Sequence, residues 1–199
     1  MPNLLVASSN KNKLIEIREV LKSVKSIRVV SFEDIKRTIP NVVEDGKTFR
    51  ENAIKKAVMV SKFFNGLVMS DDSGLEVEAL GGKPGVRSSR FARVKASDKE
   101  NVQKLLTLMA KVDDEFRLAR FVCHIALAKE GKLLDTFDAE VPGRIAFEER
   151  GTSGFGYDPI FIPAKHDQTF AEMEAEYKNK ISHRALALKK LKKAISKYL

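Results

Sequence analysis

The sequence predicts one mixed α/β unit, in which a central sheet is flanked by helices. Short apolar runs that fit buried strands alternate with segments of helical spacing along the first half of the chain. Two longer β-prone runs in the second half meet at Glu130-Gly131, the turn of a predicted hairpin. No repeat, low-complexity linker or clear domain boundary interrupts the 199 residues, so we predict a single domain in which the hairpin forms a second lobe or an interface.

The first half of the chain reads as strand, helix, strand, helix, strand. We expect strands at 3–7, 27–30 and 67–69 and helices at 13–24 and 48–65. Thr48 and Glu51 have the spacing of a capping box at the start of the second helix.

The second half carries the hairpin and three further helices. Ser97 and Glu100 predict another capped helix start. The remaining expected elements are strands at 116–129, 132–139, 143–147 and 160–162 and helices at 169–177 and 182–197.

Composition excludes several classes of protein. There is no apolar run long enough to cross a membrane and no basic signal region at the N-terminus, which favours a cytoplasmic protein. Cys123 is the single cysteine, so an internal disulfide is excluded and a zinc site is disfavoured. The net charge of +9 favours anionic partners such as nucleotides. Any metal is expected to be a hard cation such as Mg²⁺, held by oxygen ligands.

The most informative stretch is 66–75, where an apolar run ends in Asp71 and Asp72. We expect the strand to end at Met69 and Gly74 to provide a turn with positive φ. Adjacent carboxylates are costly to desolvate unless a cation or hydrogen-bond donors lie beside them. The stretch therefore indicates a metal or acid–base site, and a polar turn is the structural alternative.

Four other segments are suited to binding an anion, a metal ion or a ring. The strand–turn–helix at 8–13 offers backbone N–H groups and Lys13 to a phosphate, although an Asn-capped helix start is ordinary structure. Glu44, just before a helix, is a candidate second metal ligand. The glycine-rich loop ending in 155–158 offers aromatic faces for stacking. His183 and Arg184 lie in the first turn of a helix, where the helix dipole disfavours positive charge, which suggests that they face an anion or a polar ring. A nucleotide with its Mg²⁺ complements all of these groups.

The order of these motifs closely resembles that of the inosine triphosphate pyrophosphatase family, also called Ham1-like proteins. The resemblance runs from the first strand into the last helix. Its motifs are Ser8-Ser9-Asn10-Lys11-Asn12-Lys13, Glu44 to Ala53, Asp71 to Leu75, Gly81 to Gly85, Gly154 to Pro159 and Ser182-His183-Arg184.

The resemblance implies an elongated α/β fold with a long mixed central sheet, two lobes with a cleft between them, and a homodimer. It implies Mg²⁺-dependent hydrolysis of ITP, dITP and XTP to the monophosphate and pyrophosphate. Asp72 matches the catalytic proton acceptor, and Glu44 and Asp72 match the metal ligands. The matched substrate-binding residues are Ser8, Ser9, Asn10, Lys11, Asn12, Lys13, Ser73, Phe155, Gly156, Tyr157, Asp158, Lys178, His183 and Arg184.

In the mechanism that follows from this match, Asp72 deprotonates the attacking water and Lys13 stabilises the leaving pyrophosphate. A 6-keto purine would be selected by donors from His183, Arg184 and backbone N–H groups near Phe155. Two alternatives remain open: a Maf-like nucleotide pyrophosphatase with another base preference, and a basic nucleic-acid-binding protein. The second leaves the acidic residues unexplained, because they repel a phosphate backbone. We expect no stable nucleic-acid partner.

Overall fold

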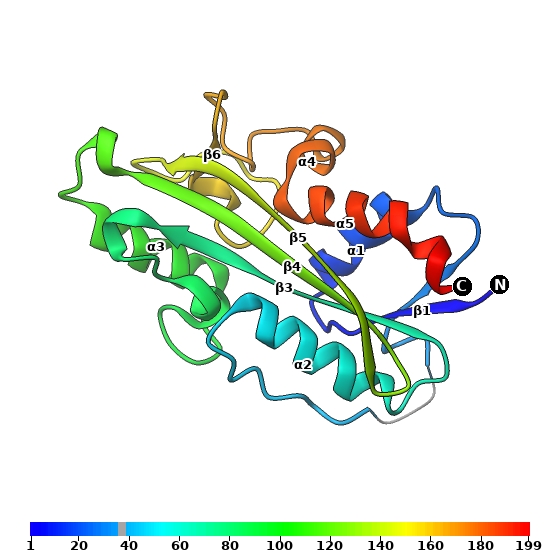
Figure 1. Ribbon diagram of the computed structural model, residues 1–199. Helices are drawn as coiled ribbons and strands as arrows, with labels where there is room; N and C mark the ends of the chain where they lie inside the picture. The colour runs from blue at the N-terminus through cyan, green and yellow to red at the C-terminus, as the bar shows by residue number, and fades with distance from the viewer. Residues whose placement is uncertain (36–38) are drawn as a thin grey trace. The chain divides into compact units, whose positions relative to one another are not determined.

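The computed structural model describes residues 1–35 and 39–199. Within these residues, six strands form one sheet in the order β2-β1-β3-β4-β5-β6 (Figure 1). The strands are β1 (Asn3–Val6), β2 (Arg28–Val30), β3 (Leu67–Val77), β4 (Leu118–Lys129), β5 (Lys132–Ile145) and β6 (Phe161–Pro163). β1 pairs in parallel with β2 and β3, whereas β5 and β6 are antiparallel, so the predicted mixed α/β class is confirmed.

The described residues form five α-helices, of which the first three connect strands and the last two follow β6. They are α1 (Lys11–Leu21), α2 (Phe49–Ser61), α3 (Asp98–Met109), α4 (Ala175–Ile181) and α5 (His183–Ala194). Asn10, Thr48 and Ser97 accept a hydrogen bond at the starts of α1, α2 and α3. The capping box of Ser97 and Glu100 is complete, whereas the Glu51 carboxylate accepts from Lys47 N–H, so Thr48 caps α2 alone. None of the helices described is long and apolar enough to cross a membrane.

The chain divides into two compact units. Unit 1 comprises Met1–Asp72, Cys123–Ala139 and Arg184–Leu199, and unit 2 comprises Ser73–Val122 and Glu140–His183. Both therefore contain residues that are distant in sequence.

Unit 1 has a core on each face of its strands. Because side chains alternate along a strand, Leu4 and Met69 face α1 and α5, while Leu5 and Val68 face the other side. Figure 1 shows α2 on the face opposite α1 and α5.

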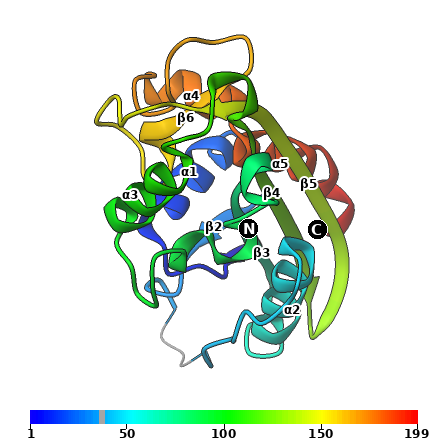
Figure 2. The ribbon, with the colours of Figure 1, turned by 90° about the vertical axis from the view of Figure 1, so that its left-hand side faces the viewer.

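The hairpin end of unit 1 packs against α2, as Figures 1 and 2 show. The Gly131 N–H at the hairpin turn donates to Ser61 Oγ at the end of α2, at 2.9 Å. Glu130 and Gly131 both have positive φ, which confirms the predicted turn. Cys123 lies fully buried on β4, and burial raises the pKa of its thiol to about 12.

Unit 2 contains an aromatic cluster and a buried arginine. The rings of Phe121, Phe161 and Phe170 contact one another, with centroids 4.6 to 5.9 Å apart. Arg117 donates to the carbonyl oxygens of Met109, Val112, Ile145 and Ala146, which joins the end of α3 to the end of β5.

Several predicted boundaries are wrong. β3 does not end at Met69 but runs through the acidic pair to Val77, and Gly74 lies within the strand with no positive φ. The strands predicted at 132–139 and 143–147 are one strand, β5. The helix predicted at 169–177 begins only at Ala175. The loop expected after Val30 includes residues 36–38, which lie outside the described residues.

Candidate active site

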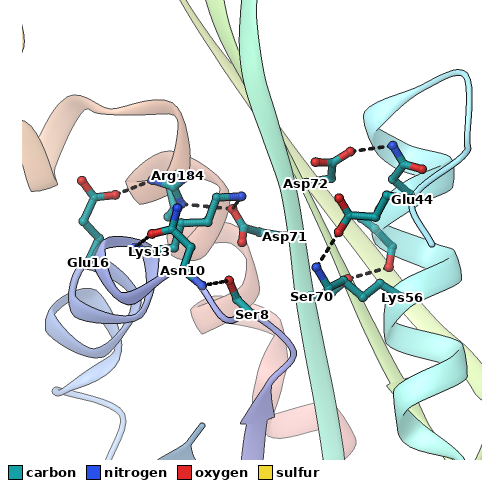
Figure 3. Close-up of polar contacts among 12 residues, drawn as sticks. Ser8, Asn10, Lys13, Glu16, Glu44, Lys56, Ser70, Asp71, Asp72 and Arg184 are labelled. Carbon is teal, nitrogen blue, oxygen red and sulfur yellow. Dashed lines mark hydrogen bonds and ion pairs between the residues drawn. The ribbon is translucent and has the colours of Figure 1, made fainter. Parts of the chain in front are cut away.

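The acidic pair lies inside strand β3, so its two carboxylates point to opposite faces of the sheet. Figure 3 shows Asp71 directed toward α1 and α5, and Asp72 directed toward α2. This follows from the alternation of side chains along a strand.

Asp71 lies in a buried ion-pair cluster. Its Oδ2 is 3.1 Å from Lys13 Nζ on α1 and 3.1 Å from Arg184 Nε on α5, and its side chain is fully buried. Arg184 also pairs with Glu16 of α1. Burial alone would raise the pKa of the Asp71 carboxyl, but the charges of Lys13 and Arg184 hold that pKa well below its usual range. Asp71 is therefore ionised at neutral pH and joins α1, β3 and α5.

Asp72 lies in a different electrostatic environment. Its Oδ2 accepts a hydrogen bond of 2.9 Å from the Asn52 side chain of α2. Burial raises the pKa of Asp72 to about 6; Lys13 and the Asn52 hydrogen bond oppose this shift, and the negative charges of Glu44 and Asp71 add to it. A carboxyl with a pKa near neutrality can act as a general base.

The raised pKa of Asp72 predicts that the metal-free protein loses stability between about pH 4 and pH 6. In that range the folded chain keeps a proton on Asp72 that the unfolded chain has lost, so the free energy of unfolding falls as pH rises. The expected fall is on the order of 2 kcal/mol. It can be measured as the difference between wild type and Asp72→Asn in urea unfolding with EDTA from pH 4 to 7.

Because Asn cannot titrate, Asp72→Asn is expected to gain stability relative to wild type as the pH rises. If the difference in the free energy of unfolding between the two proteins did not change with pH, ionisation of Asp72 would not destabilise the fold.

Glu44 and Asp72 form a donor set that suits a hard divalent cation. Figure 3 shows both side chains on the α2 side of β3, and the charge of Glu44 raises the pKa of Asp72. Glu44 pairs with the ammonium of Lys56, which supplies a positive charge there. The described residues contain no group of three or more acidic, His or Cys side chains around one point. Two carboxylates are nevertheless sufficient where substrate phosphates complete the coordination of Mg²⁺.

Residues 8–10 of the 8–13 segment lie in the turn between β1 and α1, and residues 11–13 form the start of α1. Ser8 is buried and its Oγ accepts from Asn10 N–H, while Asn10 Oδ1 accepts from Lys13 N–H as the helix cap. Ser9, Lys11 and Asn12 are exposed. The structural interpretation of Asn10 as a cap is thus confirmed, and phosphate binding by this segment stays a prediction.

The predicted nucleoside-binding loop lies in unit 2 and is held by its own carboxylate. Asp158 Oδ2 accepts from Phe155 N–H at 2.8 Å and from Lys178 Nζ at 2.5 Å. Gly154 has a φ of 77°, and a Cβ there would lie 2.1 Å from Asp158 Oδ2, so this turn requires glycine.

Aromatic contacts position Lys178 and His183. Lys178 Nζ lies 5.1 Å from the centroid of the Phe155 ring, and the His183 ring stacks on Phe121 at 4.5 Å. Both side chains are buried, so neither lies on the surface of the protein.

Two backbone donors near Phe155 are already engaged. Gly156 N–H donates to Asp98 Oδ2 at 2.7 Å, and Phe155 N–H donates to Asp158. Tyr157 OH donates to Ser88 O at 2.9 Å; burial, with a smaller contribution from the Asp98 charge, raises the pKa of its phenol. Recognition of a 6-keto oxygen by these two amides is therefore not favoured.

The structure groups the predicted residues by unit. Unit 1 holds 8–13, Glu44, Asp72 and Arg184, and unit 2 holds Ser73, 155–158, Lys178 and His183. The polar partners that were not predicted include Glu16, Asn52, Lys56 and Asp98. Asn52 had a recognisable signal, because it is a polar residue in the buried stripe of α2, between Phe49 and Ala53.

Comparison with known proteins extends the motif resemblance to the whole chain. Residues 4–194 match the Ham1 family. The chain is 43% identical to the dITP/XTP pyrophosphatase of Oceanobacillus iheyensis, over 97% of this chain and 98% of that protein. It is also 43% identical to the dITP/XTP pyrophosphatase of Bacillus subtilis, over 98% of both chains.

A solved structure shares the fold. The HAM1 protein from Coxiella burnetii superposes with a TM-score of 0.87 at 40% identity, covering 99% of this chain and 100% of that one. The motif order, the mixed sheet and these similarities together show that the chain belongs to the Ham1 family.

Proposed function

We propose that this protein hydrolyses non-standard purine nucleoside triphosphates, namely ITP, dITP and XTP, to the monophosphate and pyrophosphate. The observation that carries the proposal is the position of Asp72, a half-buried carboxylate that lies beside Glu44 on one face of β3 and whose pKa is raised to about 6. The relatives from O. iheyensis and B. subtilis are dITP/XTP pyrophosphatases, which supports the substrate class.

In the proposed mechanism, Glu44 and Asp72 hold Mg²⁺, which when bound would polarise the phosphoryl oxygens. Asp72 orients the attacking water and accepts its proton. Lys13, held by Asp71, places a positive charge near the departing pyrophosphate. Because Lys13 is fixed by an ion pair, its ammonium is preorganised for this role.

The nucleoside is proposed to bind at 155–158, where the Phe155 ring offers a stacking face. Lys178, His183 and Arg184 complete this proposed group. Buried hydrogen-bond donors there would accept a 6-keto purine but reject a 6-amino purine, because the amino group would itself be a donor facing them. Ser73 and the 8–13 segment are proposed to contact the phosphates.

The domain organisation, oligomeric state and location of the protein are also part of the proposal. We propose that the chain acts as one domain and as a homodimer in the cytoplasm. The proposal includes no membrane or stable nucleic-acid partner.

Product analysis tests this function directly. The purified protein, incubated with dITP, XTP, ITP, dTTP or ATP, is expected to release pyrophosphate from the first three far faster than from the others, and only with Mg²⁺ present. A preference for dTTP would support the Maf-like alternative. Salt-dependent binding to duplex DNA with no hydrolysis of any triphosphate would support the nucleic-acid-binding alternative.

A further inference from the structure

Asn52 of α2 is buried and uses both ends of its side-chain amide. It is 1% exposed. Its Oδ1 accepts from Gly46 N–H at 2.8 Å, and its Nδ2 donates to Asp72 Oδ2 at 2.9 Å. A buried amide that is satisfied on both sides resists rotation, since a flip would place donor against donor and acceptor against acceptor.

The two groups that Asn52 joins belong to the two predicted metal-binding segments. Gly46 lies two residues after Glu44, in the loop before α2, while Asp72 lies on β3. These segments are distant in sequence, because Gly46 and Asp72 are separated by helix α2 and the first part of β3. The Asn52 amide therefore connects the backbone of the Glu44 loop to the Asp72 carboxylate.

The loop approaches Asn52 closely. A Cβ on Gly46 would lie 2.7 Å from Asn52 Oδ1 and 2.9 Å from Glu51 Cβ, so only glycine fits there without displacement. Lys56, one helical turn after Asn52, pairs with Glu44 from the same face of α2. The helix thus contacts both carboxylate-bearing segments, at positions four residues apart.

We infer that Asn52 is a positioning residue that holds Glu44 and Asp72 in the arrangement that binds a divalent cation. Its Oδ1 is occupied by Gly46 N–H and its Nδ2 is a donor, so it acts through the two carboxylates rather than as a ligand. The inference rests on the proposed function for the role of the cation. Partners that orient metal ligands contribute about 10- to 100-fold in metal affinity or activity.

The test measures binding of Mn²⁺, a probe for the Mg²⁺ site, to the full chain without nucleotide. Free Mn²⁺ is followed by electron paramagnetic resonance, and thermal unfolding is followed with and without Mn²⁺. Asn52→Leu removes both hydrogen bonds and keeps the branched shape of the side chain. Gly46→Ala displaces the loop while Asn52 remains, and provides a second variant if Asn52→Leu does not fold.

Thr48→Ala is the matched control. It removes the N-terminal cap of the same helix and leaves the Asn52 contacts in place. We expect Asn52→Leu and Gly46→Ala to raise the Mn²⁺ dissociation constant about 10-fold or more, with a smaller thermal shift on adding Mn²⁺. Thr48→Ala is expected to bind Mn²⁺ like wild type.

Three results would overturn the inference: folded variants that bind Mn²⁺ like wild type, a Thr48→Ala control as weak as Asn52→Leu, or a wild type that binds no Mn²⁺. The proposed function is tested by a separate measurement, the release of pyrophosphate. A wild type that releases no pyrophosphate from dITP or XTP contradicts that function, while the Mn²⁺ comparison still decides the role of Asn52.

Discussion

Asp72→Asn is expected to abolish pyrophosphate release from dITP and XTP, lowering kcat by a factor of about 10²–10⁴ or more. The amide can neither accept the proton of the attacking water nor supply a negative charge to the cation. Steady-state assays of pyrophosphate release with saturating Mg²⁺ measure this effect, and circular dichroism checks that the variant is folded.

Asp45→Asn is the control for that experiment. Asp45 is the neighbour of Glu44, but it is exposed and pairs with Lys55 at the surface. It is expected to retain the wild-type rate. If Asp72→Asn kept a rate near that of wild type, the assignment of Asp72 as the catalytic base would be wrong.

Asp71→Ala is expected to destabilise the protein by about 3–5 kcal/mol, because it leaves Lys13 and Arg184 facing each other without their shared counter-charge in a buried site. Urea unfolding at pH 7 measures this loss. The stabilisation depends on ionised Asp71, whose pKa is lowered on folding. It is therefore fully present above about pH 4, the pKa in the unfolded chain, and declines as the pH falls further.

The matched comparison is again Asp45→Asn, which breaks an exposed ion pair and is expected to leave the unfolding midpoint nearly unchanged. A loss below about 1 kcal/mol for Asp71→Ala would mean that the buried cluster contributes no more than a surface pair. It would also remove the argument that Asp71 preorganises Lys13.

Periodicity and capping were sufficient to predict most of the helices and strands. Leu14, Ile17 and Leu21 carry the spacing of α1, and Asn10 and Ser97 cap helices as ordinary cap residues do. These features depend on contacts within a few residues, which is why the local sequence contains them.

The interior of β3 could not be predicted in the same way. Ser70, Asp71 and Asp72 are polar and precede a glycine, which is the usual composition of a turn. They continue the strand because distant groups satisfy them: Ser70 donates to Ala53 O, and Asp71 pairs with Arg184. Such partners become visible only once the chain is folded.

Partners that are distant in sequence also limit how much of the site could be predicted. The motifs identified Glu44, Asp72 and the 155–158 loop as candidates, because unusual residue types cluster there. They did not identify Asn52 or Asp98, each of which contacts its partner from a helix more than fifteen residues away in sequence. Asn52 stands out only as a polar residue within the buried stripe of α2, and Asp98, an acidic residue in the first turn of α3, has no distinctive local pattern.

The burial of Cys123 gives this protein an internal reporter of its own unfolding. It is the single cysteine of the chain, it is fully buried, and its thiol is protonated at neutral pH. Thiol reagents react with the exposed thiolate, so the folded molecule is inert and each modification event marks an opening of the core. The rate of labelling thus reports the free energy of opening at β4, beside the charged cluster of Asp71 and Arg184, without any engineered probe.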